Sequence, residues 1–133
     1  AHSEFNASQK EPVHFLQIWI DPNEAGGEPA YQQKSFPREE MQGRLRVVVS
    51  PDGREGSLTI RQDAYMYSGV LGPGAALNYV FEAGRRAYVH VARGAVEANG
   101  KGLAAGDGMK IKEESEIHLT TREGAEVLLF DLP

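Results

Sequence analysis

Short apolar stretches bounded closely by turn-forming residues are the feature that most constrains the fold of this chain. The 133 residues include 15 glycines and 7 prolines, and helical periodicity of the apolar residues is almost absent. Instead, apolar and polar residues alternate over about four to eight positions between turns rich in Gly, Pro, Asn and Asp. Many short stretches at even spacing predict an all-β fold, an antiparallel sandwich or barrel.

The pattern also predicts where the individual elements lie. Asn99-Gly100 is the strongest two-residue hairpin signal, and residues 37–41 could form one helical turn that begins at a proline. The predicted strands are residues 13–20, 45–49, 58–63, 64–71, 76–81, 87–92, 95–98, 115–120 and 126–132, with a strand–turn–strand unit over 103–111.

Composition excludes several classes of function. The net charge of −5 supplies no basic stripe for nucleic acid, and no apolar run approaches the roughly 20 residues that span a bilayer. The sequence contains no cysteine, which excludes disulfides and thiolate chemistry and is consistent with a reducing compartment. Because no signal peptide is visible either, we expect a cytoplasmic protein with neither nucleic acid nor membrane as partner.

His2 and Glu4 form the most specific candidate site. Residues two apart on an extended strand point to the same face, so the imidazole and the carboxylate would lie together. This pair is half of a non-haem site suited to iron, manganese or nickel. The alternative is an ordinary solvated terminus that happens to carry two polar residues.

Several stretches of the chain resemble the pirin family. They are residues 2–6, residues 15–20 followed by Pro22, residues 50–58 followed by Gln62-Asp63, and residues 126–132. Pirins are bicupins similar to quercetin 2,3-dioxygenases, and the spacing from Gly94 to Gly106-Asp107 also resembles a cupin, a double-sheet jelly roll. The resemblance implies a chain that covers the C-terminal part of a pirin and begins within the end of the first cupin.

The resemblance also implies the site residues. The pirin metal is held by a His-x-His motif and a later His-x-Glu motif, which matches His2 and Glu4; the other two histidines would lie upstream of Ala1. The cofactor would be a divalent metal, Fe(II) in the intact protein. That protein would be a quercetinase-like dioxygenase in which the metal anchors a flavonol and Glu4 is both ligand and catalytic base.

The cupin pattern can be counted through the second barrel as well. Its ligand positions, taken back from Gly94 and forward from Gly106, are occupied by Val80, Glu82, Arg86 and Ile117, with His118 one residue away. These residues cannot supply the two histidines and carboxylate of a cupin site. We therefore expect the C-terminal barrel to bind no metal.

These observations predict three segments. Residues 1–22 would be terminal strands of an N-terminal cupin whose other strands are absent, residues 23–43 a linker, and residues 44–133 the C-terminal cupin barrel. The orphan strands would pack on their own barrel, on a second copy by strand exchange, or on a chain that carries the missing half. This chain alone would be structural and inactive, and the alternative function is a protein-binding module or transcriptional co-regulator of the pirin type.

Other polar and aromatic residues have simpler interpretations. Four aromatic residues could line a pocket, but alternating aromatics in strands are expected in the core or in cross-strand pairs; they are Trp19, Tyr65, Tyr67 and Tyr79. The pair Arg85-Arg86 is expected in an exposed turn.

Overall fold

The computed structural model describes residues 2–133 and confirms an all-β fold. Over that range the chain forms nine strands and two single-turn 3-10 helices. In chain order they are η1 (Arg38–Glu40), β1 (Leu45–Ser50), η2 (Arg54–Gly56), β2 (Leu58–Thr59), β3 (Tyr65–Leu71), β4 (Ala76–Val80), β5 (Arg86–Ala98), β6 (Lys101–Ala104), β7 (Gly108–Ile111), β8 (Glu116–Thr120) and β9 (Ala125–Leu132). Neither of these helices is long and apolar enough to cross a membrane, for the part of the chain that is described.

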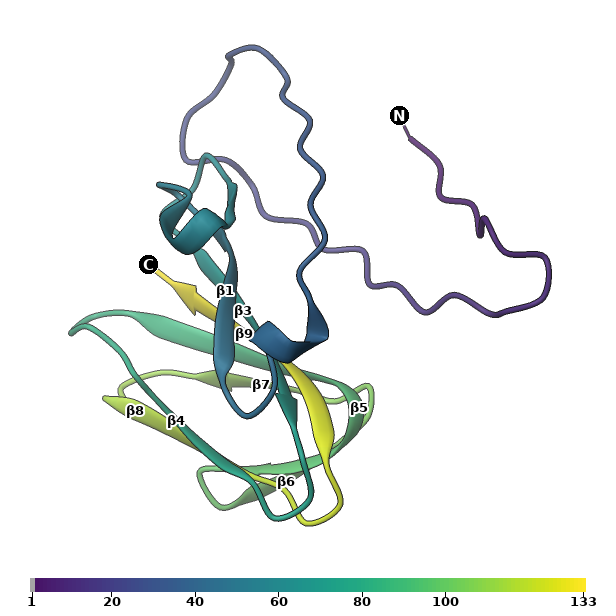
Figure 1. Cartoon of the computed structure of the whole chain (residues 1–133). Helices are drawn as coiled ribbons and strands as arrows, with labels where there is room; N and C mark the ends of the chain where they lie inside the picture. The colour runs from purple at the N-terminus through teal and green to yellow at the C-terminus, as the bar shows by residue number, and fades with distance from the viewer. Residues whose placement is uncertain (1) are drawn as a thin grey trace.

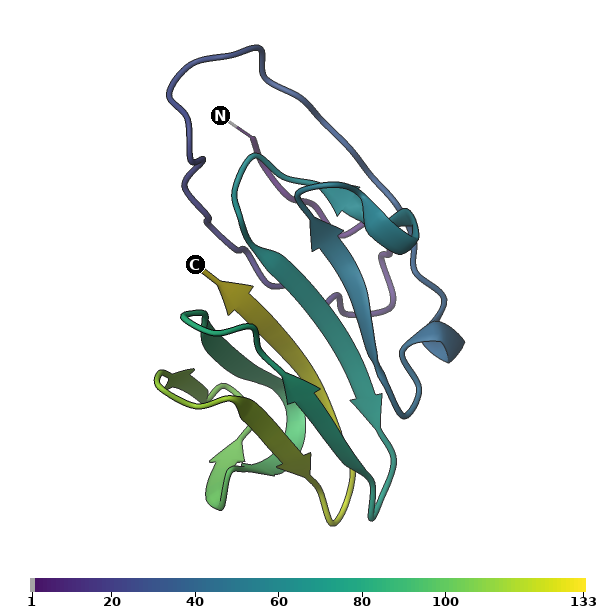
Figure 2. The same ribbon diagram turned by 90° about the vertical axis from the view of Figure 1, so that its left-hand side faces the viewer.

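The strands form one curled sheet in the order β2-β1-β3-β9-β5-β8-β4, with β6 and β7 also paired to β5 (Figure 1). β1 and β2 pair in parallel, and the other strand pairs among residues 45–132 are antiparallel. Figure 2 shows the C-terminal strand β9 lying beside β3. The sheet therefore curls from the β1–β3–β9 side round to the β8–β4 side and encloses the core as a half-barrel.

A bulge in β5 makes this curl compatible with a single apolar interior. The first half of β5 pairs with β9 and β7, and the second half pairs with β6 and β8. The register with β9 shifts between Val91 and Arg93, so the buried side chains change from odd positions up to Val91 to even positions from Val96. Gly94 follows this bulge and pairs with Ala125. Its φ is +74°, and a Cβ there would stand 2.2 Å from the carbonyl oxygen of Gly124.

The interior is apolar, as the alternating pattern predicts. Val89, Val91, Ile117 and Leu129 are all fully buried, and they come from three strands that face one another across the curl. Each of these strands alternates buried and more exposed positions, which is the period-two pattern of a sheet with one face in the core.

Most of the predicted elements of the barrel are confirmed. The hairpin turn lies at Asn99-Gly100, where both residues have positive φ values of 46° and 79° as a type I′ turn requires. The helical turn near Pro37 is present as η1. The strand predicted over residues 58–63 is shorter, because only Leu58–Thr59 pairs with β1.

The strand predicted over residues 13–20 is wrong for this chain. Residues 2–37 contain no strand, and the segment runs as extended backbone away from the barrel before it returns (Figure 1). A strand exists only where a neighbour accepts and donates its backbone hydrogen bonds, and the described residues offer no such neighbour to this segment. Residue 1 of the predicted N-terminal unit lies outside the described residues.

The segment that leads into the barrel is held by hydrogen bonds to the barrel's edge. The backbone N–H of Asn23 donates to the carbonyl of Arg61 at 2.9 Å. The Gln62 side chain donates to the Asp21 carbonyl at 2.8 Å, and the backbone N–H of Thr59 donates to the Gln32 side chain at 3.0 Å. The predicted linker is therefore a strap along the barrel rather than a free tether.

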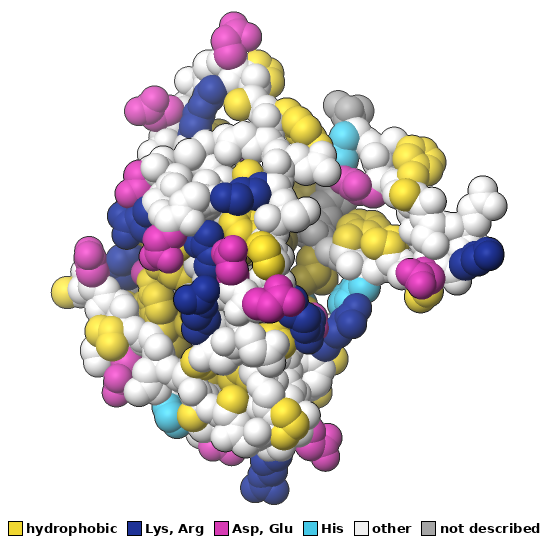
Figure 3. Space-filling model, in the orientation of Figure 1, with side chains coloured by type: hydrophobic (Ala, Val, Ile, Leu, Met, Phe, Trp, Pro, Cys, Tyr) yellow, Lys and Arg dark blue, Asp and Glu magenta, His cyan; other side chains and the backbone are white. Residues whose placement is uncertain are grey.

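Large apolar side chains on the N-terminal segment remain exposed. Phe5, Trp19 and Tyr31 are between 84% and 87% exposed, and Figure 3 shows yellow hydrophobic side chains on the part of the segment that projects from the barrel. On the barrel in the same view, acidic and basic side chains are interspersed.

Candidate metal site and the mouth of the barrel

His2 and Glu4 line one cavity, as the spacing predicts. Their side chains are about 60% exposed, and 3.9 Å separates His2 Nε2 from Glu4 Oε1. The opposite wall of this cavity, whose volume is about 410 Å³, is formed by residues 15–20. The structure therefore brings the two predicted ligands together on the same side of the N-terminal segment.

An imidazole nitrogen and a carboxylate oxygen are a donor pair that fits a divalent first-row metal. The pair is only part of a ligand set. Within residues 2–133, no group of three or more His, Cys, Asp or Glu side chains is placed so that it could hold a metal ion. Their assignment as metal ligands, and of Glu4 as the catalytic base, stays a prediction.

The counted ligand positions of the C-terminal barrel are placed unfavourably for a metal. Val80 is 70% exposed on β4, whereas its neighbours Tyr79 and Phe81 are the more buried residues. Ile117 is fully buried in the core, and His118 lies on the outer side of β8, where Nδ1 contacts Asn78 Oδ1. That this barrel binds no metal remains a prediction, and the geometry of these residues supports it.

The barrel has instead a polar cluster at its mouth, which lines a cavity of about 290 Å³. Asp131, on β9, is 5% exposed and forms an ion pair with Arg85 Nε. Arg85 Nη1 also lies 3.0 Å from Asp63 Oδ2. Although burial opposes its charge, these hydrogen bonds to the two carboxylates raise the pKa of the Arg85 guanidinium above its ordinary value.

Two tyrosines complete the cluster. The Tyr79 hydroxyl donates to Asp131 Oδ2 at 2.6 Å and lies 3.1 Å from the Tyr67 hydroxyl. Because Tyr79 has one proton and the carboxylate is the stronger acceptor, the Tyr67 hydroxyl donates to Tyr79 in turn. Burial, together with the hydrogen bond to Asp131, raises the pKa of Tyr79 above its usual range, and burial likewise raises the pKa of Tyr67.

This cluster corrects one expectation and confirms another. Arg85 is not in an exposed turn, since its side chain is only 13% exposed, whereas its neighbour Arg86 is exposed as expected. Tyr67 and Tyr79 pack against the core as expected, with ring centroids 4.9 Å apart, whereas Trp19 is 84% exposed and does not. A single aspartate within the apolar run of residues 125–132 was the one sequence signal that could have indicated a buried partner for Arg85.

A curled, mostly antiparallel sheet around a filled interior is an architecture that double-sheet jelly rolls, the cupins among them, adopt. Residues 47–132 match the model of the quercetinase C-terminal cupin domain of pirins. The chain therefore belongs to the pirin family.

Individual relatives agree with this assignment. The chain is 40% identical over 132 residues to quercetin 2,3-dioxygenase of Escherichia coli, covering 99% of this chain and 56% of the relative. The crystal structure of YhhW from Escherichia coli matches with a TM-score of 0.81 and 36% identity, over 86% of this chain and 48% of that one. A structure described as the bacterial pirin YhhW in complex with nickel(II) matches with a TM-score of 0.78 and 38% identity, over 84% and 47% of the two chains. The chain thus spans about half the length of the relatives that it matches.

Proposed function

We propose that this chain is the C-terminal part of a pirin-type bicupin that oxidises a flavonol such as quercetin with O₂, in a metal site shared with an N-terminal cupin. The observation that carries the proposal is the pairing of His2 and Glu4 on one cavity wall. The relatives named quercetin 2,3-dioxygenase are nearly twice as long as this chain. The nickel(II) complex of a similar pirin supports a divalent metal, and we propose Fe(II) as the native one.

His2 and Glu4 would hold this metal together with two histidines from the segment before Ala1. A bound divalent metal acts as a Lewis acid toward a substrate oxygen. Glu4 would accept the proton of the flavonol hydroxyl, because its carboxylate is the one basic group beside His2 on the cavity wall. The extended backbone that places Glu4 on the cavity wall would place the His2 side chain on the same face.

The C-terminal barrel has a structural role in this proposal. Its own interior is filled by apolar side chains, and its outer face lines a cavity together with residues 16–20 of the N-terminal segment. The exposed apolar side chains of that segment would be covered by the N-terminal cupin, so the same surface does not require a separate protein partner. We place the protein in the cytoplasm.

The test uses the longer protein obtained by extending the reading frame upstream of Ala1. Purified with Fe(II), it should consume quercetin and O₂, and Glu4→Gln should lose turnover because an amide cannot accept the hydroxyl proton. Glu11→Gln, on the exposed part of the same segment, is the matched control and should retain activity. Full turnover by Glu4→Gln, or turnover by the 133-residue chain alone, would contradict the proposal.

A further inference from the structure

The edges of the curled sheet differ in how their backbone groups are protected. β2, at one end of the strand order, is two residues long, and the N-terminal segment covers it, since the Thr59 N–H donates to the Gln32 side chain. β6 and β7 carry Lys101 and Lys110, and a lysine on an edge strand discourages pairing with another strand. β4 lies at the opposite end of the order (Figure 1). Its five residues are uncharged, and none of the strands described within residues 2–133 pairs with its outer edge.

The backbone of β4 directs alternate residues toward that open edge. β4 is antiparallel to β8, and Asn78 lies directly opposite His118. The N–H and C=O of His118 both bond to Asn99, which follows β5 on the other side of β8. Opposite residues of an antiparallel pair either exchange both backbone hydrogen bonds or direct both groups away from each other. Asn78 therefore directs its N–H and C=O to the open edge, and by the same alternation so do Ala76 and Val80.

The side chains of these three residues leave the edge accessible. Ala76, Asn78 and Val80 are all exposed, and the exposed fraction of Val80 reaches 70%. Leu77 and Tyr79 instead pack against the core, so the strand itself is held firmly in the sheet. Unpaired N–H and C=O groups along an exposed, uncharged edge are a template for the addition of another strand.

The sequence of β4 makes a second copy of the chain a matching partner. If two copies of β4 lie antiparallel about a two-fold axis at Asn78, Ala76 of each copy faces Val80 of the other. The two Asn78 residues then face each other, and an amide can bond to its own copy because it is both donor and acceptor. Glu82 is the charged residue nearest to the strand, and the same register sets it opposite Gly74. No like charges meet in this arrangement, so nothing in the pair opposes association.

We propose that the open edge of β4 is a self-association surface, through which two copies of the protein join their sheets. The interface uses the same surface of both copies, so the assembly closes at the dimer. One pair of five-residue strands buries little area, which makes the dimer weak and dependent on concentration. The surface is separate from the cavity of His2 and Glu4, which no residue of β4 lines, and the inference does not depend on the proposed function.

The experiment measures mass and strand pairing separately. Sedimentation velocity is run on the 133-residue chain and on the longer protein over a wide range of concentration. Asn78→Lys places two positive charges opposite each other at the axis, and Asn78→Asp places two negative ones there. Gln9→Lys is the matched control, because it makes the same change from amide to ammonium on the exposed N-terminal segment. Circular dichroism checks the fold of each variant, and amide hydrogen exchange followed by NMR reports the pairing of β4.

Both forms of the wild-type protein should approach twice the monomer mass as the concentration rises. Exchange of the Asn78 and Val80 amide protons should slow at the same time, whereas that of Tyr79, which the alternation directs to β8, should not change. Asn78→Lys and Asn78→Asp should each weaken the dimer about tenfold or more. An equal mixture of these two variants should restore it, and Gln9→Lys should behave as wild type.

Three results overturn the proposal. The first is a wild-type protein that stays monomeric at every concentration, and the second is a dimer that Asn78→Lys leaves intact or that the mixture of charged variants does not restore. The third is a dimer of the 133-residue chain that is absent from the longer protein, because the N-terminal half would then cover this edge.

Discussion

Removal of the Arg85 guanidinium is the perturbation that most directly tests how the barrel mouth is stabilised. In Arg85→Met, the aliphatic stem is kept and the charge is lost, so Asp131 stays buried with the Tyr79 hydroxyl as its one remaining side-chain partner. A buried ion pair broken on one side typically costs about 3–5 kcal/mol, because the other charge is left uncompensated. The second contact of Arg85 adds at most about 1 kcal/mol, since the side chain of its partner Asp63 is 55% exposed.

We therefore expect Arg85→Met to lower the free energy of unfolding by about 3–5 kcal/mol at pH 7. For a domain of this size, even the lower value corresponds to a fall in Tm of more than about 10 °C. Replacing Asp131 with Asn in the same protein removes the charge and keeps an acceptor for Tyr79, which should recover at least about 1 kcal/mol.

Urea unfolding of the 133-residue chain, followed by circular dichroism, measures these differences. Arg86→Met is the matched control, because Arg86 is the exposed neighbour, and it should change stability by no more than about 0.5 kcal/mol. The reasoning is refuted if Arg85→Met is within about 1 kcal/mol of wild type, or if the double variant is no more stable than Arg85→Met.

Two further predictions concern the same barrel. Folding raises the pKa of Tyr79. The stabilisation linked to this shift is therefore complete below the unfolded pKa of about 10 and is lost as the pH rises further. The free energy of unfolding falls by up to about 1.4 kcal/mol per pH unit, which is an upper limit because solvent screens a half-buried ring. Urea titrations between pH 9 and 11 should show a shallower loss in Tyr79→Phe than in wild type, and equal slopes would contradict this. Gly94→Ala should lose more than about 2 kcal/mol in thermal unfolding, because it combines a positive φ with a clash against the Gly124 carbonyl. Gly100→Ala, at a similar φ with open space around it, should lose only about 1 kcal/mol, and equal losses would refute the clash.

The sequence predicted those features that depend on neighbouring residues. The hairpin at Asn99-Gly100 and the strands around it depend on local turn geometry and period-two alternation, and the approach of His2 to Glu4 follows from a separation of two residues. The prediction of a strand over residues 13–20 was wrong because a strand needs a neighbouring strand for its backbone hydrogen bonds. Alternation of apolar and polar residues does not show whether such a neighbour exists. The pairing of Arg85 with Asp131 joins residues 46 positions apart, which no local pattern encodes.

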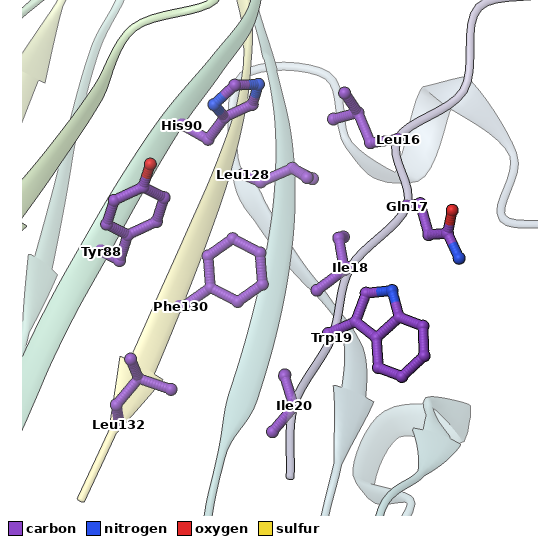
Figure 4. A pocket seen from close by; sticks show the side chains of 10 residues that line it. All are labelled: Leu16, Gln17, Ile18, Trp19, Ile20, Tyr88, His90, Leu128, Phe130 and Leu132. Atoms are coloured by element: carbon purple, nitrogen blue, oxygen red, sulfur yellow. The ribbon is translucent and has the colours of Figure 1, made fainter.

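The spatial arrangement also adds what the pattern alone left open. Leu16, Ile18 and Ile20 of the N-terminal segment are directed toward the outer face of β9 and β5, across a cavity of about 340 Å³ (Figure 4). The choice among the three packing modes expected of this segment stays a prediction.

Metal content is the measurement that tests the central claim most directly. Elemental analysis after Fe(II) or Ni(II) loading should find one metal per longer protein, and a strong loss of that metal in both His2→Ala and Glu4→Ala. The 133-residue chain, with two donors on an exposed segment, should retain far less than one metal under the same conditions. Equal metal content in the longer protein and in its variants without His2 or Glu4 would contradict the account.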